Sequence, residues 1–90
     1  MRKFKRAAVE SAGFAIENND HTAVTIQDFS RMGMSFITDK TFQPKSFVSI
    51  MYQNETNQII QMKIYIKNIT MKTNRKFRVG ALFIAIESRN

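Results

Sequence analysis

The fold is indicated by the stretch IQMKIYIK, residues 60–67, in which apolar and polar side chains alternate along the chain. The apolar positions are Ile60, Met62, Ile64 and Ile66. Since successive side chains of a β-strand point to opposite faces, this alternation is typical of a strand with one face buried and one in water. The stretch therefore predicts a β-strand at the surface of a core.

Outward from this stretch, five further runs have the composition of strands and are separated by turn-forming residues. The longest covers residues 77–86 and is rich in β-branched and aromatic side chains. Its apolar face is predicted to contain Phe77, Val79, Ala81, Phe83 and Ala85. The shorter runs are residues 9–17, 22–28, 34–38 and 47–53. No helical periodicity is sustained, so the pattern predicts an all-β, antiparallel barrel or sandwich.

The composition excludes several classes of protein. Ninety residues fit one domain, and the absence of cysteine excludes disulfides and thiolate metal sites, which favours a cytoplasmic location. No run approaches the ~20 apolar residues of a membrane span. His21 is the one histidine and lies in a polar turn, so we interpret it as solvated rather than as a metal ligand or a base. An enzyme is not expected.

A net charge of +7 favours anionic partners, which include nucleic acid, nucleotides, phospholipid headgroups and acidic proteins. Charge alone does not choose among these partners. Several of the basic residues gather near the end of the chain: Lys67, Lys72, Arg75, Lys76 and Arg78. They can serve as a solvated edge that blocks strand-to-strand aggregation, or as a docking face for an acidic partner or RNA.

Two clusters carry chemistry suited to a guanine nucleotide: MRKFKR, residues 1–6, and DFSRMG, residues 28–33. An arginine can fork onto a phosphate or onto guanine O6 and N7, and its flat face can stack on the base. The Asp28 carboxylate can accept hydrogen bonds from the guanine N1–H and N2–H₂ edge, and the Ser30 hydroxyl can contact the ligand or lock the turn. Gly33 suits a turn that needs a positive φ or a close approach of the main chain to a ligand.

Each cluster taken alone also has a simpler explanation. A basic N-terminal hexamer is often a solvated tail, and Asp-x-Ser-x-x-Gly often forms an ordinary turn in which the aspartate bonds its own backbone. Their occurrence in this order in a small β-rich chain favours the functional interpretation.

An Arg-x-x-x-Arg run followed by Asp-x-Ser-x-x-Gly resembles the two-part signature of PilZ domains. The matching residues are Arg2, Arg6, Asp28, Ser30 and Gly33. The run RVGALF, residues 78–83, is also similar to the closing strand of the family, with a glycine followed by a phenylalanine. The resemblance extends over essentially the whole chain.

The resemblance implies a six-stranded antiparallel β-barrel with little or no helix that binds cyclic di-GMP without catalysis and without a cofactor. Residues 1–8 would form a flexible segment and residues 9–90 the barrel. By the same resemblance, Arg2 and Arg6 clamp the ligand, and Asp28 and Ser30 recognise the guanine base. Gly33 holds the turn open. Arg31 is a candidate for a phosphate contact. The segment of residues 1–8 becomes ordered when cyclic di-GMP binds, and the signal passes to a partner protein.

Two other functions remain open at this point. One is a small basic barrel that binds single-stranded nucleic acid, for which Tyr52, Tyr65 and Phe4 are the available stacking platforms. The sequence lacks the dense aromatic pattern of such proteins, which makes nucleic acid the less favoured partner. The other is a PilZ-like interaction module that does not bind nucleotide. The regulated process, the partner, the ligand stoichiometry and the oligomeric state are not predicted.

Overall fold

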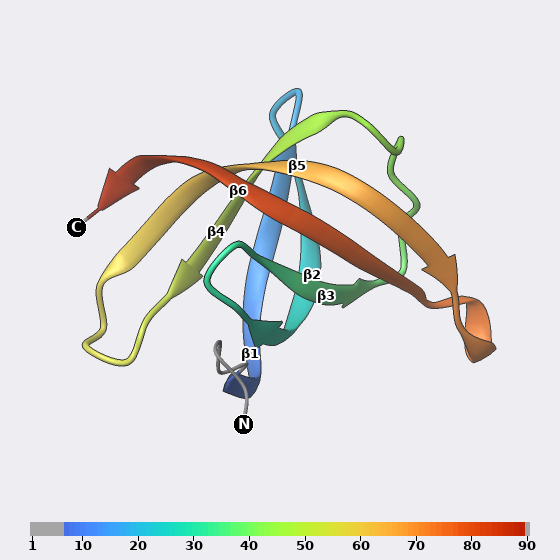
Figure 1. Ribbon diagram of the computed structural model, residues 1–90, viewed down its shortest axis with the longest axis horizontal. Coiled ribbons are helices and arrows are strands. Elements are labelled where there is room, and N and C mark those ends of the chain that lie inside the picture. The colour runs from blue at the N-terminus through green and yellow to red at the C-terminus, as the bar shows by residue number, and fades with distance from the viewer. Residues whose placement is uncertain (1–6, 90) are drawn as a thin grey trace.

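Six antiparallel strands close into a barrel in this computed structural model, which describes residues 7–89 and the side chains of residues 11–87 (Figure 1). The strands are β1 (Ala7–Glu17), β2 (Asp20–Phe29), β3 (Gly33–Thr38), β4 (Phe47–Gln53), β5 (Ile59–Met71) and β6 (Phe77–Arg89). Within the described chain, the one helical element is the single 3-10 turn η1 (Thr73–Arg75). The predicted six-stranded antiparallel barrel with little or no helix is confirmed.

The strands follow the order β1-β2-β3-β6-β5-β4 around the barrel, and the pairing of β1 with β4 closes it. The β5–β6 hairpin is built from the two longest strands and crosses the whole molecule in Figure 1. The hairpin turns have the chemistry that tight turns require. Asn18 and Asn19, for example, both have positive φ between the paired residues Glu17 and Asp20.

The core lies inside the barrel and is built from the inward faces of all six strands. Ile64 and Ile66, from the stretch that predicted a strand, are fully buried there. The other large and fully buried side chains are Phe36, Ile26, Ile50 and Val79. Each such side chain contributes about 1.5–3 kcal/mol through removal of apolar surface from water. The barrel is therefore stabilised by the same alternation that predicted it.

The predicted apolar face of the last strand is correct only up to Phe83. Ile64 pairs with Phe83, whereas the preceding residue, Lys63, pairs with Ala85, so Ile84 is the extra residue of a β-bulge. The bulge moves Ala85 to the outer face, opposite the exposed Lys63. The prediction that Ala85 shares the face of Phe83 was wrong because the bulge inverts the alternation of the residues that directly follow it.

The first strand begins two residues before the predicted run of residues 9–17. β1 begins at Ala7, and Ala7 and Ala8 pair with Phe29 and Asp28 of β2. The first paired residues thus lie within the range 1–8 that the sequence assigned to a ligand-clasping segment. Residues 1–6, which make up the rest of that segment, lie outside the described residues.

Candidate functional site

The turn between β2 and β3 carries three of the residues that the sequence singled out, and Ser30 holds this turn together. The backbone N–H of Ser30 donates to the Gly33 carbonyl oxygen at 2.8 Å, and the Gly33 N–H donates to the Ser30 hydroxyl oxygen at 3.2 Å. The Ser30 hydroxyl in turn donates to the Gly33 carbonyl oxygen at 3.3 Å. Of the two roles considered for Ser30, the structure shows the turn-locking one.

Gly33 is required by close packing rather than by its backbone conformation. It does not have a positive φ, so that part of the sequence interpretation was wrong. A Cβ atom added at Gly33 would lie 2.0 Å from the carbonyl oxygen of Ala81 in β6. Only glycine lets the turn approach the neighbouring strand this closely, because there is no Cβ to collide with the backbone of β6.

A β-bulge turns Asp28 toward the outer face of the barrel. Ile26 pairs with Phe36 and Asp28 pairs with Ser35, so Gln27 is the extra residue between them. Without the bulge, simple alternation from the buried Ile26 would aim Asp28 into the core. With it, Phe29 packs against the core instead. Bulges often redirect a side chain in this way at functional sites.

Asp28 belongs to a row of paired residues that crosses five strands on the outer face. The row consists of Ala8, Asp28, Ser35, Gly80 and Asn68. Arg78, two residues before Gly80 on β6, reaches back to this row. Its Nη2 atom lies 3.5 Å from Asp28 Oδ2 and donates to the Ser35 hydroxyl oxygen at 3.5 Å. Arg78 thus brings a guanidinium to the carboxylate and the hydroxyl of the row, so that groups from three strands meet.

A hollow of about 390 Å³ lies beside this row, over β3, β6 and β5. The residues that line it include Ser30, Gly33, Ser35, Arg78, Gly80 and Leu82. A Cβ added at Gly80 would lie 2.8 Å from the side-chain oxygen of Asn68, so the Asn68 side chain packs against Gly80 and would have to move to admit a larger residue. The volume is within the range of ~300–1,000 Å³ typical of small-ligand sites.

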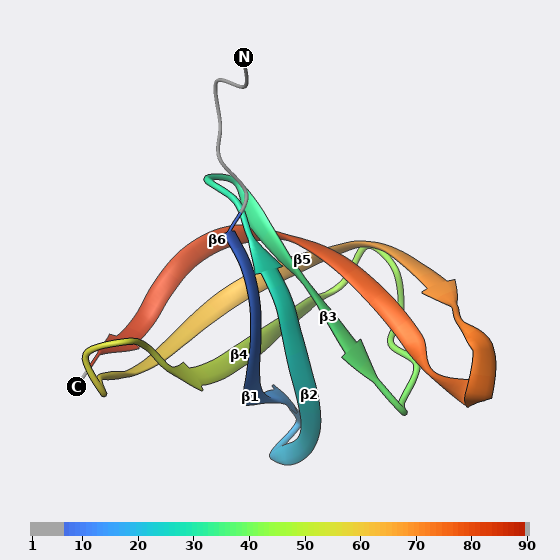
Figure 2. The ribbon, with the colours of Figure 1, turned by 90° about the horizontal axis from the view of Figure 1, so that it is seen from below.

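The structure brings Asp28, Ser30 and Gly33 together at one corner of the barrel. Arg31 lies exposed in the same turn. Arg2 and Arg6 lie outside the described residues, but Ala7, which follows Arg6 in the chain, pairs with Phe29. Figure 2 shows the beginning of β1, in dark blue, next to the end of β2 and the turn into β3.

Sequence reasoning missed Arg78 as a site residue and grouped it with a basic stretch near the chain end. A usable signal existed, because Arg78 and Gly80 are two residues apart on one strand and therefore share a face. What the sequence did not contain was the pairing that sets this face of β6 next to Asp28. That pairing runs through β3, since Ser35 pairs both with Asp28 and with Gly80.

Comparison with known protein families matches residues 1–90, the whole sequence, to the PilZ domain. The chain belongs to the PilZ domain family. The resemblance based on the two arginines and the Asp28–Gly33 turn is thereby confirmed at the level of the family. A PilZ domain is a binding or adaptor module, and its family carries no known catalytic activity.

Among solved structures, the PilZ domain is similar to the Bacillus subtilis inhibitor of motility (MotI/DgrA), with a TM-score of 0.78 and 12% sequence identity. The alignment covers 98% of this chain and 44% of that chain, so the PilZ domain spans less than half the length of its structural relative. At this identity the likeness supports the barrel fold alone. A search of curated proteins found no significant match.

The described residues of the PilZ domain contain no group of three or more histidine, aspartate or glutamate side chains placed to hold a metal ion. Across residues 7–89 there is also no helix with the length and apolar character needed to cross a membrane.

Proposed function

We propose that this PilZ domain is a cyclic di-GMP receptor that has no catalytic activity and signals through a partner protein. The ligand would lie in the hollow beside Asp28, with one guanine edge toward the carboxylate. Arg2 and Arg6 would approach from the segment that precedes β1 and bind the phosphates, and Arg31 is a further candidate for a phosphate contact.

The observation that carries the proposal is the pairing of Ala8 with Asp28, because Asp28 in turn pairs with Ser35, which lines the hollow. It brings the start of β1 next to the one carboxylate of the predicted signature. In the sequence a single residue, Ala7, separates Arg6 from Ala8. This short separation supports the proposal that Arg6 and Asp28, which are far apart in sequence, would contact the same ligand.

The chemistry of the corner suits guanine. The Asp28 side chain is 13% exposed, and a carboxylate in so sheltered a position gives strong, directed hydrogen bonds to the N1–H and N2–H₂ donors of the base. The hydrogen bonds between Ser30 and Gly33 hold the turn in one conformation before ligand arrives. Preorganisation of this kind raises affinity because less conformational freedom is lost on binding.

Isothermal titration calorimetry with cyclic di-GMP tests the proposal, with cyclic di-AMP and GTP as competitor nucleotides. We expect selective binding that is largely lost in Arg2→Ala and Arg6→Ala and weakened in Asp28→Ala. Truncation of one partner of a sheltered, charge-assisted contact typically costs about 2–5 kcal/mol of binding free energy.

Asp39→Ala is the matched control. Asp39 is an exposed carboxylate that pairs with Lys76, and it neither lines the hollow nor pairs with a residue that does, as Asp28 does with Ser35, so its loss should leave binding unchanged. Absence of heat in the wild-type titration at high ligand concentration would contradict the proposal and favour an interaction module that does not bind nucleotide.

A further inference from the structure

An apolar band crosses the outer face of the barrel, starting at the corner that holds Ser30 and Gly33. Gly33 pairs with Leu82, Leu82 with Tyr65, and Tyr65 with Phe47, so one continuous row runs across β3, β6, β5 and β4. We define the outer band as the side chains of Phe47, Tyr65 and Leu82 in this row, together with Met32, which precedes Gly33. It is a surface feature, because none of its members is fully buried.

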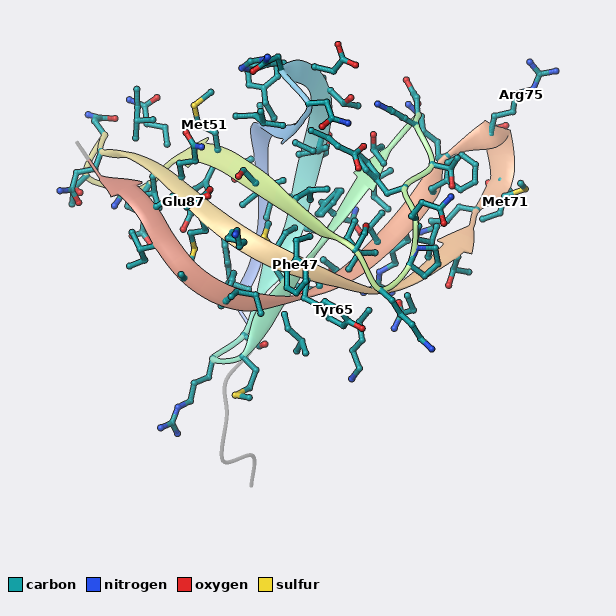
Figure 3. All side chains as sticks on the ribbon, turned by 90° about the horizontal axis from the view of Figure 1, so that it is seen from above. Phe47, Met51, Tyr65, Met71, Arg75 and Glu87 are labelled. Atoms are coloured by element: carbon teal, nitrogen blue, oxygen red, sulfur yellow. The ribbon has the colours of Figure 1, made fainter. Side chains whose placement is uncertain are left out.

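The band presents more apolar surface than a solvated strand face requires. Phe47 is 56% exposed and Met32 is 64% exposed. The rings of Phe47 and Tyr65 pack together with their centroids 5.2 Å apart, and Figure 3 shows the two side chains next to each other at β4 and β5. Contiguous exposed aromatic and methionine side chains are typical of protein interfaces.

Lysines surround the band. Lys63 places its Nζ atom 6.0 Å from the centre of the Phe47 ring, and Lys45 and Lys67 are two residues from Phe47 and Tyr65 along their own segments of chain. All three lysines are exposed, and none forms a salt bridge with another described residue. Glu87, the nearby carboxylate on β6, accepts hydrogen bonds from Ser49 and Gln61. The rim of the band is therefore mainly cationic.

The band is continuous with the proposed ligand site. Met32 and Leu82 line the same hollow as Ser30 and Arg78. A ligand in the hollow would contact one end of the band, so it would change the surface that a partner meets. This link between ligand and partner rests on the proposed function, whereas the docking surface itself does not.

We propose that the outer band is the docking surface for a partner protein that offers an apolar anchor surrounded by carboxylates. The anchor packs on Phe47 and Tyr65, and the carboxylates pair with Lys45, Lys63 and Lys67. Interfaces combine an apolar centre with a complementary charged rim in this manner, and the centre carries most of the binding energy.

Single-stranded nucleic acid is less well suited to this surface. Such ligands stack successive bases on a series of aromatic rings along a basic groove. The band has one aromatic pair, whose planes are tilted by 56°, and its other two members are the aliphatic Leu82 and Met32. Aliphatic side chains at the hollow end fit a protein anchor rather than a run of bases.

The test selects peptides from a random displayed library on the immobilised protein, once without ligand and once with cyclic di-GMP. We expect enriched peptides with an aromatic or leucine anchor flanked by aspartate or glutamate. Synthetic copies of these peptides are then titrated with the protein, and binding is measured by fluorescence polarisation. The Phe47→Ser and Lys63→Glu variants should each bind the peptides with a Kd at least about tenfold higher than that of the wild type. Both positions are exposed, so either variant tests the surface even if the other fails to fold.

Two control variants distinguish peptide binding at the band from nonspecific binding. Ile86→Ser removes a comparably exposed apolar side chain that is not part of the band, and Lys72→Glu reverses an exposed charge away from it. Both should leave peptide binding unchanged. Peptides without acidic flanks, or binding insensitive to Phe47→Ser and Lys63→Glu, would overturn the proposal. Displacement of the peptides by a short oligothymidylate would also overturn it, by assigning the band to nucleic acid.

The same variants distinguish this inference from the proposed function. Phe47→Ser should retain cyclic di-GMP binding in calorimetry, because Phe47 does not line the hollow. If the wild type bound no cyclic di-GMP but still bound acidic peptides through Phe47, the proposed receptor function would fail and the docking surface would stand. If it bound the nucleotide but no peptide at the band, the reverse would hold.

Discussion

The guanidinium of Arg78 lies beside the Asp28 carboxylate, with Nη2 3.5 Å from Oδ2, and it donates to the Ser35 hydroxyl oxygen at the same distance. Arg78 is 45% exposed and Asp28 is 13% exposed. An ion pair with one half-exposed partner adds little to the stability of a fold. The contact is more important for orientation, because it holds the carboxylate of the proposed guanine-reading residue on the outer face.

The first prediction concerns this orienting contact. Arg78→Ala should weaken cyclic di-GMP binding by about tenfold, or about 1.4 kcal/mol, since Asp28 loses a cation that helps to position it. Arg78→Lys should retain most of the affinity, because an ammonium group can still bridge Asp28 and Ser35. Calorimetry measures both. Tighter binding by Arg78→Ala would contradict the prediction and show that Arg78 competes with the ligand for Asp28.

The second prediction compares two glycines of the hollow. Gly33→Ala should destabilise the barrel by about 1–3 kcal/mol or more, because the new Cβ meets backbone, the carbonyl oxygen of Ala81. Gly80→Ala should cost less, because its Cβ meets only the Asn68 side chain, which can move. Thermal unfolding followed by circular dichroism ranks the two variants. Equal losses would contradict the assignment of Gly33 to strand packing.

Gly80→Ala also gives a separate prediction about the hollow. The added methyl group displaces the Asn68 side chain, and both residues line the hollow, so the folded variant should bind cyclic di-GMP more weakly than the wild type. Calorimetry on a sample shown to be folded measures this effect. Unchanged affinity would place the ligand elsewhere on the barrel.

The fourth prediction concerns the turn held by Ser30. Ser30→Ala removes the acceptor for the Gly33 N–H, and a hydrogen bond of this kind contributes about 0.5–1.5 kcal/mol. Native-state hydrogen exchange should show faster exchange of the Gly33 amide, with little change in the core strands. Ser46→Ala, which removes an exposed hydroxyl bonded to the Gln43 carbonyl, is the control and should not alter exchange at Gly33. A protected Gly33 amide in Ser30→Ala would contradict the turn-locking role.

The fifth prediction tests the core. Ile64→Ala should lower the free energy of unfolding by about 2–5 kcal/mol, because Ile64 is fully buried and its loss leaves a cavity. Ile84→Ala, at the bulge residue that is 49% exposed, should change it much less. Urea unfolding of both variants provides the comparison. Similar losses would show that the burial of Ile64 does not govern stability.

The strands and several turns could be predicted from the sequence because they depend on local properties. The alternation at residues 60–67 reports one buried face, since a strand has a side-chain period of two. The Asn18-Asn19 turn follows from the tolerance of asparagine for positive φ, which both residues adopt. The residues of the PilZ signature were also visible as types and spacing, and the family comparison bears out the family that they indicate.

The direction in which each site residue points, inward or outward, was decided only by the strand pairing in the closed barrel. From the buried Ile26, alternation alone would turn Asp28 inward, and the bulge at Gln27 reverses it. The meeting of Arg78 with Asp28 depends on the placement of β3 between β2 and β6. The need for glycine at position 33 likewise comes from the approach of Ala81. Local patterns record which residues can form strands, whereas bulges and strand order arise from pairings between distant segments that a single sequence does not specify.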